Sequence, residues 1–88
     1  MGHMQKNRIY ESMTRIVHGG YTIRVWTRES EFQWRDKSGP RIEIVEAIES
    51  LPPSPTQIAH TLDTFEDVSA YEILDAEGNG AIVYPDWP

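Results

Sequence analysis

The chain has 88 residues, of which 39% are hydrophobic and 25% charged, and its formal net charge is −6. This length suits one domain, and the composition is too apolar for an intrinsically disordered chain. The absence of cysteine excludes a disulfide scaffold, a thiol nucleophile and a cysteine-based zinc site. No apolar stretch approaches a membrane span, and the polar N-terminus lacks the apolar run of a signal peptide. We therefore expect a cytoplasmic protein with no membrane contact.

The N-terminal part of the chain allows two structures. Met1-Gly2-His3 has the character of vector-derived sequence, which leaves residues 4–88 as a single domain. Met13 to Val17 could form a strand that turns through His18-Gly19-Gly20 into the next one. Helical spacing of apolar residues instead favours a helix over 5–18 that ends at Gly19, and this is the preferred interpretation; those residues are Ile9, Tyr10, Met13, Ile16 and Val17.

Residues 21–28 are predicted to form a strand with two different faces. Tyr21, Ile23 and Val25 should point one way because successive strand side chains alternate. The other face would carry Thr22, Arg24, Trp26 and Arg28. A second strand at 31–35 would form a hairpin through Arg28-Glu29-Ser30, and residues 36–40 have the composition of a turn.

Two helices are predicted next. Pro40 suits a first helical turn, and the helix should end before Pro52-Pro53. Its apolar residues recur every three positions, with a stripe of glutamates on the other side; the two sets are Ile42, Val45, Ile48 and Leu51 with Ile44 beside them, and Glu43, Glu46 and Glu49. Ser54-Pro55-Thr56-Gln57 has the capping-box pattern that begins a helix, whose apolar stripe is Ile58, Leu62 and Phe65.

Strands at 68–74 and 81–84, joined by a turn at 75–80, complete the expected fold. The sequence thus predicts an α+β domain in which a small antiparallel sheet of three to four strands packs against two helices, with an extra helix at the N-terminus. Helices of this length are marginal alone in water, so packing on the sheet should hold both.

Charge is distributed unevenly along the chain. All eight lysines and arginines lie between Lys6 and Arg41, whereas ten of the fourteen acidic residues follow Arg41. The two segments either neutralise each other within the fold or form a bipolar surface whose acidic side binds a basic partner. Opposed charges also permit head-to-tail self-association.

The leading functional hypothesis is a non-enzymatic protein-interaction module that binds a protein with a basic surface. Small acidic accessory or inhibitor proteins of phages and mobile elements often act in this way. Trp87 would be a partner anchor if exposed, although packing on the sheet is its simpler role. The candidate partner-binding residues are Glu43, Glu46, Glu49, Asp63, Glu66, Asp67 and Trp87, with Glu72 extending the acidic stripe.

A calcium site is one alternative. The segment that begins at Asp75 resembles the EF-hand loop, in which oxygen ligands alternate before a glycine. Asp75, Glu77 and Asn79 would take the first, third and fifth places, and Asp86 the twelfth. Glutamate is long for the third place, the twelfth residue is usually Glu, and Pro85 leaves no exiting helix. A plain hairpin turn explains the same residues.

Single-stranded nucleic acid is the other alternative ligand. Arg24, Trp26 and Arg28, with Trp34 nearby, combine aromatic rings that stack on bases with cations that neutralise phosphate. The negative net charge opposes this function, and we do not expect nucleic acid to be the main partner.

Catalysis has the weakest support in the sequence. Beyond His3, the only histidines are His18 and His60, and Asp63 lies one helical turn from His60. No set of residues supplies a nucleophile, a base and an oxyanion stabiliser together. We expect a protein that is not an enzyme and has no cofactor.

Overall fold

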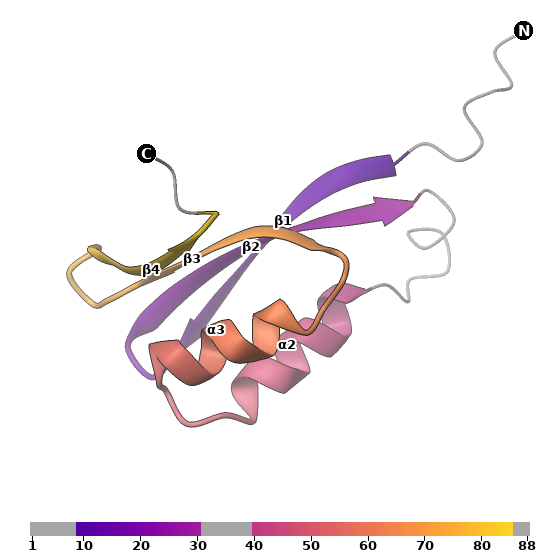
Figure 1. The fold of residues 1–88 in the computed structure, drawn as a ribbon. Coiled ribbons are helices and arrows are strands. Elements are labelled where there is room, and N and C mark those ends of the chain that lie inside the picture. Colours follow the sequence, from indigo (N-terminus) through magenta and orange to yellow (C-terminus); the bar gives the residue numbers. More distant parts are fainter. Residues whose placement is uncertain (1–8, 31–39, 86–88) are drawn as a thin grey trace, which may run out of the picture.

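The computed structural model describes residues 9–30 and 40–85. Four strands form one antiparallel sheet in the order β1-β2-β3-β4, and both helices cover the same face of it (Figure 1). The elements are β1 (Ile9–His18), β2 (Tyr21–Ser30), α2 (Pro40–Glu49), α3 (Pro55–Asp63), β3 (Val68–Leu74) and β4 (Gly80–Tyr84). The expected α+β class, with an antiparallel sheet and two helices, is confirmed. The strand expected at 31–35 lies outside the described residues.

The preferred helix over residues 5–18 is wrong across residues 9–18, which form β1. This strand pairs with β2 over its whole length, from Ile9 opposite Ser30 to His18 opposite Tyr21. Gly19 and Gly20 have φ angles of +59° and +88°, as a two-residue type I′ hairpin requires. The turn and the pairing with β2 override the helical spacing, and the alternative turn at residues 18–20 is confirmed. Because β2 continues to Ser30, residues 28–30 are strand and not the expected turn.

The core lies between the helices and the face of the sheet that they cover. Ile23 and Val25 on β2 are fully buried, which confirms the alternation predicted for this strand. Ile73 lies opposite Ile23 on β3 and is also fully buried. Each such isoleucine stabilises the fold by roughly 1.5–3 kcal/mol through removal of apolar surface from water. The full buried cluster is Ile16, Ile23, Val25, Ile44, Ile48, Ile58, Ala59, Leu62, Tyr71 and Ile73.

The two helices divide the sheet between them. Helix α2 contacts β1 and β2, whereas α3 contacts β3 and β4. A packed helix pair is about 8–10 Å apart and two strand spacings are about 10 Å, so two helices match the width of four strands. Two helices side by side are therefore wide enough to cover one face of the four-stranded sheet.

Helix α2 is rotated relative to the stripe expected from its sequence. Ile44 and Ile48 are buried, Val45 and Leu51 pack at the margin of the core, and the side chain of Ile42 is 55% exposed. At about 100° per residue, Ile42 lies about 160° around the helix from Ile44, so the two cannot share a face. The three-residue spacing that included Ile42 in the core was wrong at that position.

Helix α3 begins after Ser54, the N-cap residue that the capping-box pattern predicts. The Ser54 hydroxyl accepts a hydrogen bond from the Gln57 amide at 3.5 Å, and Pro55 takes the first helical position. In a full capping box the Ser54 amide would donate to the Gln57 side chain, but here it donates to the Pro52 carbonyl at 2.7 Å. The helix ends at Asp63, before Phe65, which packs half-buried against the core.

Candidate interaction surfaces

The outer side of α2 carries three exposed glutamates. Glu43, Glu46 and Glu49 span an arc of about 120° around the helix. At about 100° per residue, the centre of this arc lies about 180° from the midpoint between Ile44 and Ile48. Because these two isoleucines are buried against the sheet, the glutamate side of the helix faces outward. The packing of α2 thus determines that all three carboxylates face solvent.

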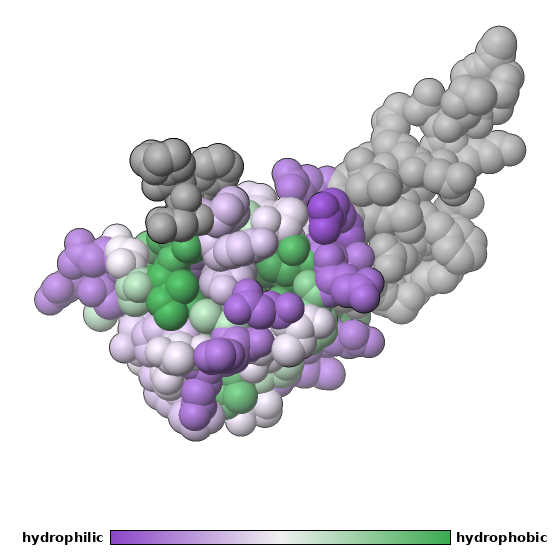
Figure 2. All heavy atoms as spheres, in the orientation of Figure 1, coloured by the Kyte–Doolittle hydropathy of each residue, from purple (hydrophilic) through white to green (hydrophobic). Residues whose placement is uncertain are grey.

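Two further acidic side chains are exposed where α3 ends. Asp63 is the last residue of α3, and Glu66 lies in the connection to β3. We call Glu43, Glu46, Glu49, Asp63 and Glu66 the acidic helix surface. Figure 2 shows hydrophilic residues on the helical side of the molecule, among separate groups of hydrophobic residues of which one lies near β4.

The other predicted acidic residues are placed differently. Asp67 is half-buried and its carbonyl accepts a hydrogen bond from the Arg28 amide at 2.8 Å. Glu72 projects from the opposite face of the sheet, where its Oε2 atom lies 2.9 Å from Nη1 of Arg24. The predicted acidic stripe is therefore divided between two faces, and Trp87 lies outside the described residues.

The two described helices leave the second face of the sheet uncovered, and this face carries the predicted nucleic-acid residues of β2. Arg24, Trp26 and Arg28 lie on it, two residues apart along β2, while Trp34 lies outside the described residues. Both guanidinium groups already have partners within the protein. Arg24 is bound to Glu72, and Nη2 of Arg28 donates to the Glu66 carbonyl at 3.3 Å.

The uncovered face also includes β1 residues that the helical interpretation of 5–18 hid. Arg15 lies opposite Arg24, and Met13 lies opposite Trp26. Glu11 lies near Ser69, whose hydroxyl is 2.7 Å from Glu11 Oε2 and 3.2 Å from the Trp26 carbonyl. The Gly19-Gly20 pair directly before the strand predicted at 21–28 is the sequence signal that would have placed them on the first strand of a hairpin.

The candidate calcium loop is a tight turn whose backbone amides are hydrogen-bonded within the turn itself. Oδ1 of Asp75 accepts hydrogen bonds from the amides of Glu77 and Asn79, each at 2.9 Å. Gly78, with φ +87°, donates its amide to the Asp75 carbonyl at 3.0 Å. One carboxylate oxygen of Asp75 is thus engaged in the turn, and Asp86 lies outside the described residues. Within residues 9–30 and 40–85, no group of three or more His, Asp or Glu side chains is placed to hold a metal ion.

A tyrosine-lined groove of about 350 Å³ lies between the end of α3 and the β3–β4 edge. The hydroxyl of Tyr71 donates to Oδ1 of Asp63 at 2.8 Å, and its ring stacks on Tyr84 with centroids 5.4 Å apart. Burial, followed by the hydrogen bond to Asp63, raises the pKa of Tyr71 to about 12. Tyr71 therefore keeps its proton at neutral pH, and its hydrogen bond fastens α3 to β3.

Neither histidine in the described part of the chain belongs to a catalytic arrangement. His18 Nε2 lies 2.6 Å from the Leu51 carbonyl, which ties the end of β1 to the chain that follows α2. His60 is exposed on α3, while the Asp63 carboxylate is bonded to Tyr71. Among the described helices, none has both the length and the apolar character to cross a membrane.

Comparisons with family models, with curated proteins and with solved structures found no match to this chain. The functions of the candidate surfaces are therefore inferred from their own residues.

Proposed function

We propose that this protein is a non-enzymatic interaction module that binds a protein with a basic surface through the acidic helix surface. The observation that carries the proposal is the rotation of α2, which presents Glu43, Glu46 and Glu49 to solvent opposite the buried Ile44 and Ile48. Three carboxylates held on one rigid helix keep fixed spacings, and such a pattern favours partners with matching cations.

The distribution of charge over the two faces supports this proposal. Of the four arginines in the described residues, Arg15, Arg24 and Arg28 lie on the uncovered sheet face and Arg41 lies at the start of α2. The acidic helix surface therefore carries more negative than positive charge, because the arginines beside it are Arg28, bonded to the Glu66 carbonyl, and Arg41 at the start of α2. Such a field accelerates encounter with a basic partner and orients it, over a range of about 10 Å at moderate salt.

Neutralising the α2 carboxylates should weaken partner binding. In the variant Glu43→Gln/Glu46→Gln/Glu49→Gln we expect affinity to fall by roughly tenfold, because each exposed ion pair contributes about 0.5 kcal/mol. The partner would be captured on immobilised protein at low salt, identified, purified and titrated against both proteins by calorimetry. Raising the salt concentration should weaken the wild-type complex more than the variant complex.

A matched control variant also removes three negative charges, but at other places on the molecule. The variant Glu11→Gln/Glu72→Gln/Glu77→Gln changes the uncovered face and the β3–β4 turn, and it should keep affinity within about twofold because charges far from the acidic helix surface are screened. Equal losses in both variants would show that only net charge matters. An affinity that neither the first variant nor salt changes would exclude the acidic helix surface as the binding site.

Single-stranded nucleic acid is a second candidate because Arg24, Trp26 and Arg28 share the sheet face that neither described helix covers. Stacking of a base on Trp26 would quench its fluorescence. We expect quenching by oligo-dT at low salt in a Trp34→Phe/Trp87→Phe background, where Trp26 is the remaining tryptophan. Adding Arg28→Gln should weaken the quenching, and no quenching at low salt would exclude this function.

A further inference from the structure

The strand β1 is a long outer strand of the sheet, and no other described strand pairs with its outer edge. It has ten residues, pairs with β2 in unbroken register, and contains neither proline nor lysine, which commonly protect sheet edges. The residues that flank a two-residue hairpin form a hydrogen-bonded pair, and such pairs alternate along the ladder. Because His18 lies opposite Tyr21, the main-chain groups of the odd-numbered residues of β1 point away from β2 and towards the free edge.

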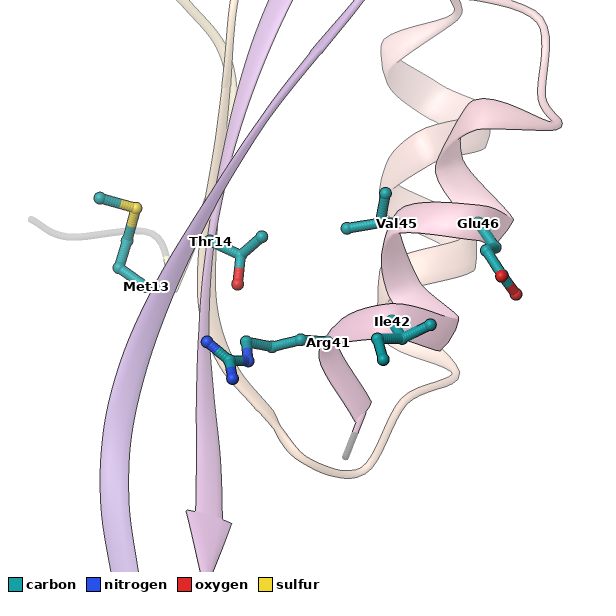
Figure 3. A pocket seen from close by; sticks show the side chains of 6 residues that line it. All are labelled: Met13, Thr14, Arg41, Ile42, Val45 and Glu46. Atoms are coloured by element: carbon teal, nitrogen blue, oxygen red, sulfur yellow. The ribbon is translucent and has the colours of Figure 1, made fainter. Parts of the chain in front are cut away.

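An apolar groove lies beside this edge. It has a volume of about 530 Å³ and extends from the first turns of α2 to β1, where Thr14 points towards α2 and Met13 points away from it (Figure 3). Met13 is 48% exposed and Ile42 is 55% exposed, so apolar surface is accessible to a partner at this edge. The lining residues are Met13, Thr14, Arg41, Ile42, Val45 and Glu46, so one cation and one anion accompany the apolar groups.

The sequence of β1 is complementary to itself. If two copies pair antiparallel with Met13 opposite Met13, Glu11 of each copy lies opposite Arg15 of the other. Moving the two-fold axis by one residue in either direction places one of these charges opposite Met13 instead. We infer that two copies of this chain pair through β1 about a two-fold axis at Met13, forming a continuous eight-stranded sheet. This inference goes beyond the proposed function and does not depend on it.

The helical layer accommodates this pairing. Helix α2 lies over β1 and β2, so a partner strand at about 4.8 Å from β1 would bring the two α2 helices to about 10 Å, the distance of packed helices. Ile42 and Val45 of the two copies would then face each other across the groove. The pairing would cover the exposed apolar residues beside the edge.

A buried hydroxyl beside the axis supports the same register. Thr14 Oγ1 is buried and has no hydrogen-bond partner among residues 9–30 and 40–85. Buried hydroxyl groups are usually hydrogen-bonded. In the Met13-centred register, Thr14 lies opposite Ser12 of the second copy on the helix-covered face, and cross-strand Thr–Ser pairs form hydrogen bonds.

Charge reversal on β1 tests the inference by sedimentation equilibrium of the full chain. The wild type should form a concentration-dependent dimer of twice the 10.1 kDa chain mass. Arg15→Glu and Glu11→Arg should each raise the dimer dissociation constant about tenfold or more, because like charges would then face each other twice. Mixing the two variants, or combining both changes in one chain, should restore association. The control Glu77→Arg, which changes charge as Glu11→Arg does but at the β3–β4 turn, should behave as wild type.

Folding is measured separately from association. Arg15 lies opposite Arg24 within the monomer, so Arg15→Glu should leave the monomer at least as resistant to thermal unfolding as wild type while it loses the dimer. A wild-type chain that stays monomeric at every concentration would overturn the inference. So would a dimer that survives both single reversals, or one lost in Glu43→Gln/Glu46→Gln/Glu49→Gln but retained in both β1 variants.

Discussion

Alanine at Gly19 should destabilise the fold far more than alanine at the adjacent Gly20. Gly19 has φ +59°, and a Cβ atom there would overlap Cβ of Pro53 and lie 2.7 Å from its Cγ. The left-handed backbone costs about 1–2 kcal/mol for alanine, and displacing the proline ring adds about 1–3 kcal/mol. We expect a loss of about 2–5 kcal/mol in the free energy of unfolding, measured by urea denaturation. Marginal stability at this size would leave much of the chain unfolded.

Gly20 provides the matched control. Its φ angle is +88°, and a Cβ atom there would have nothing within 4 Å, so Gly20→Ala should cost only the backbone strain of about 1–2 kcal/mol. In a Pro53→Gly background the obstructing ring is absent, and the cost of Gly19→Ala should approach that of Gly20→Ala. Equal costs for the two glycines in the wild-type background would show that the contact between the hairpin turn and Pro53 has no energetic weight.

Local sequence signals predicted the elements whose boundaries depend on local chemistry. Pro40 and the pair Ser54-Pro55 begin α2 and α3 where the capping and proline rules expect them. Strand β3 covers the residues 68–74 that its composition predicted, and the turn at 75–80 has the positive φ at Gly78 that glycine permits. In each case the deciding contacts lie within a few residues.

The errors concern contacts between residues distant in sequence. Apolar spacing in residues 9–18 fits a helix on its own, and only pairing with β2 selects the strand. Ile42 fits a three-residue spacing, but the rotation of α2 is determined by Ile44 and Ile48 packing on the sheet. These errors hid the β1 edge and the groove beside it, which the further inference requires.

The candidate surfaces were predictable only in part. The segregation of charge along the chain indicated a bipolar molecule, and the alternation in β2 placed Arg24, Trp26 and Arg28 on one face. The sequence did not indicate that Glu72 would pair with Arg24 on that face, because the two residues meet only through the register of β2 and β3. Which charged side chains pair with each other thus depends on tertiary contacts, and a count of charges along the sequence does not contain this information.

Replacing Tyr71 with phenylalanine should weaken the fold and change its response to alkaline pH. The hydroxyl donates to the Asp63 carboxylate, and a hydrogen bond to a charged group contributes about 1.5–3 kcal/mol. We expect Tyr71→Phe to lose stability of this size at pH 7 in urea denaturation. Tyr84→Phe is the matched control, since it removes a hydroxyl from the exposed ring of the same stack.

The pH dependence follows from the raised pKa of Tyr71. The native protein holds this proton up to a pKa of about 12, whereas the unfolded chain releases it near 10.0. Between these values the unfolded state binds fewer protons, so stability falls as pH rises; the contribution is complete below pH 10.0 and lost above about 12. The difference in stability between wild type and Tyr71→Phe should therefore shrink over this interval, while Tyr84→Phe follows wild type. A constant difference would mean that Tyr71 ionises equally in both states and that its burial against Asp63 does not hold the proton.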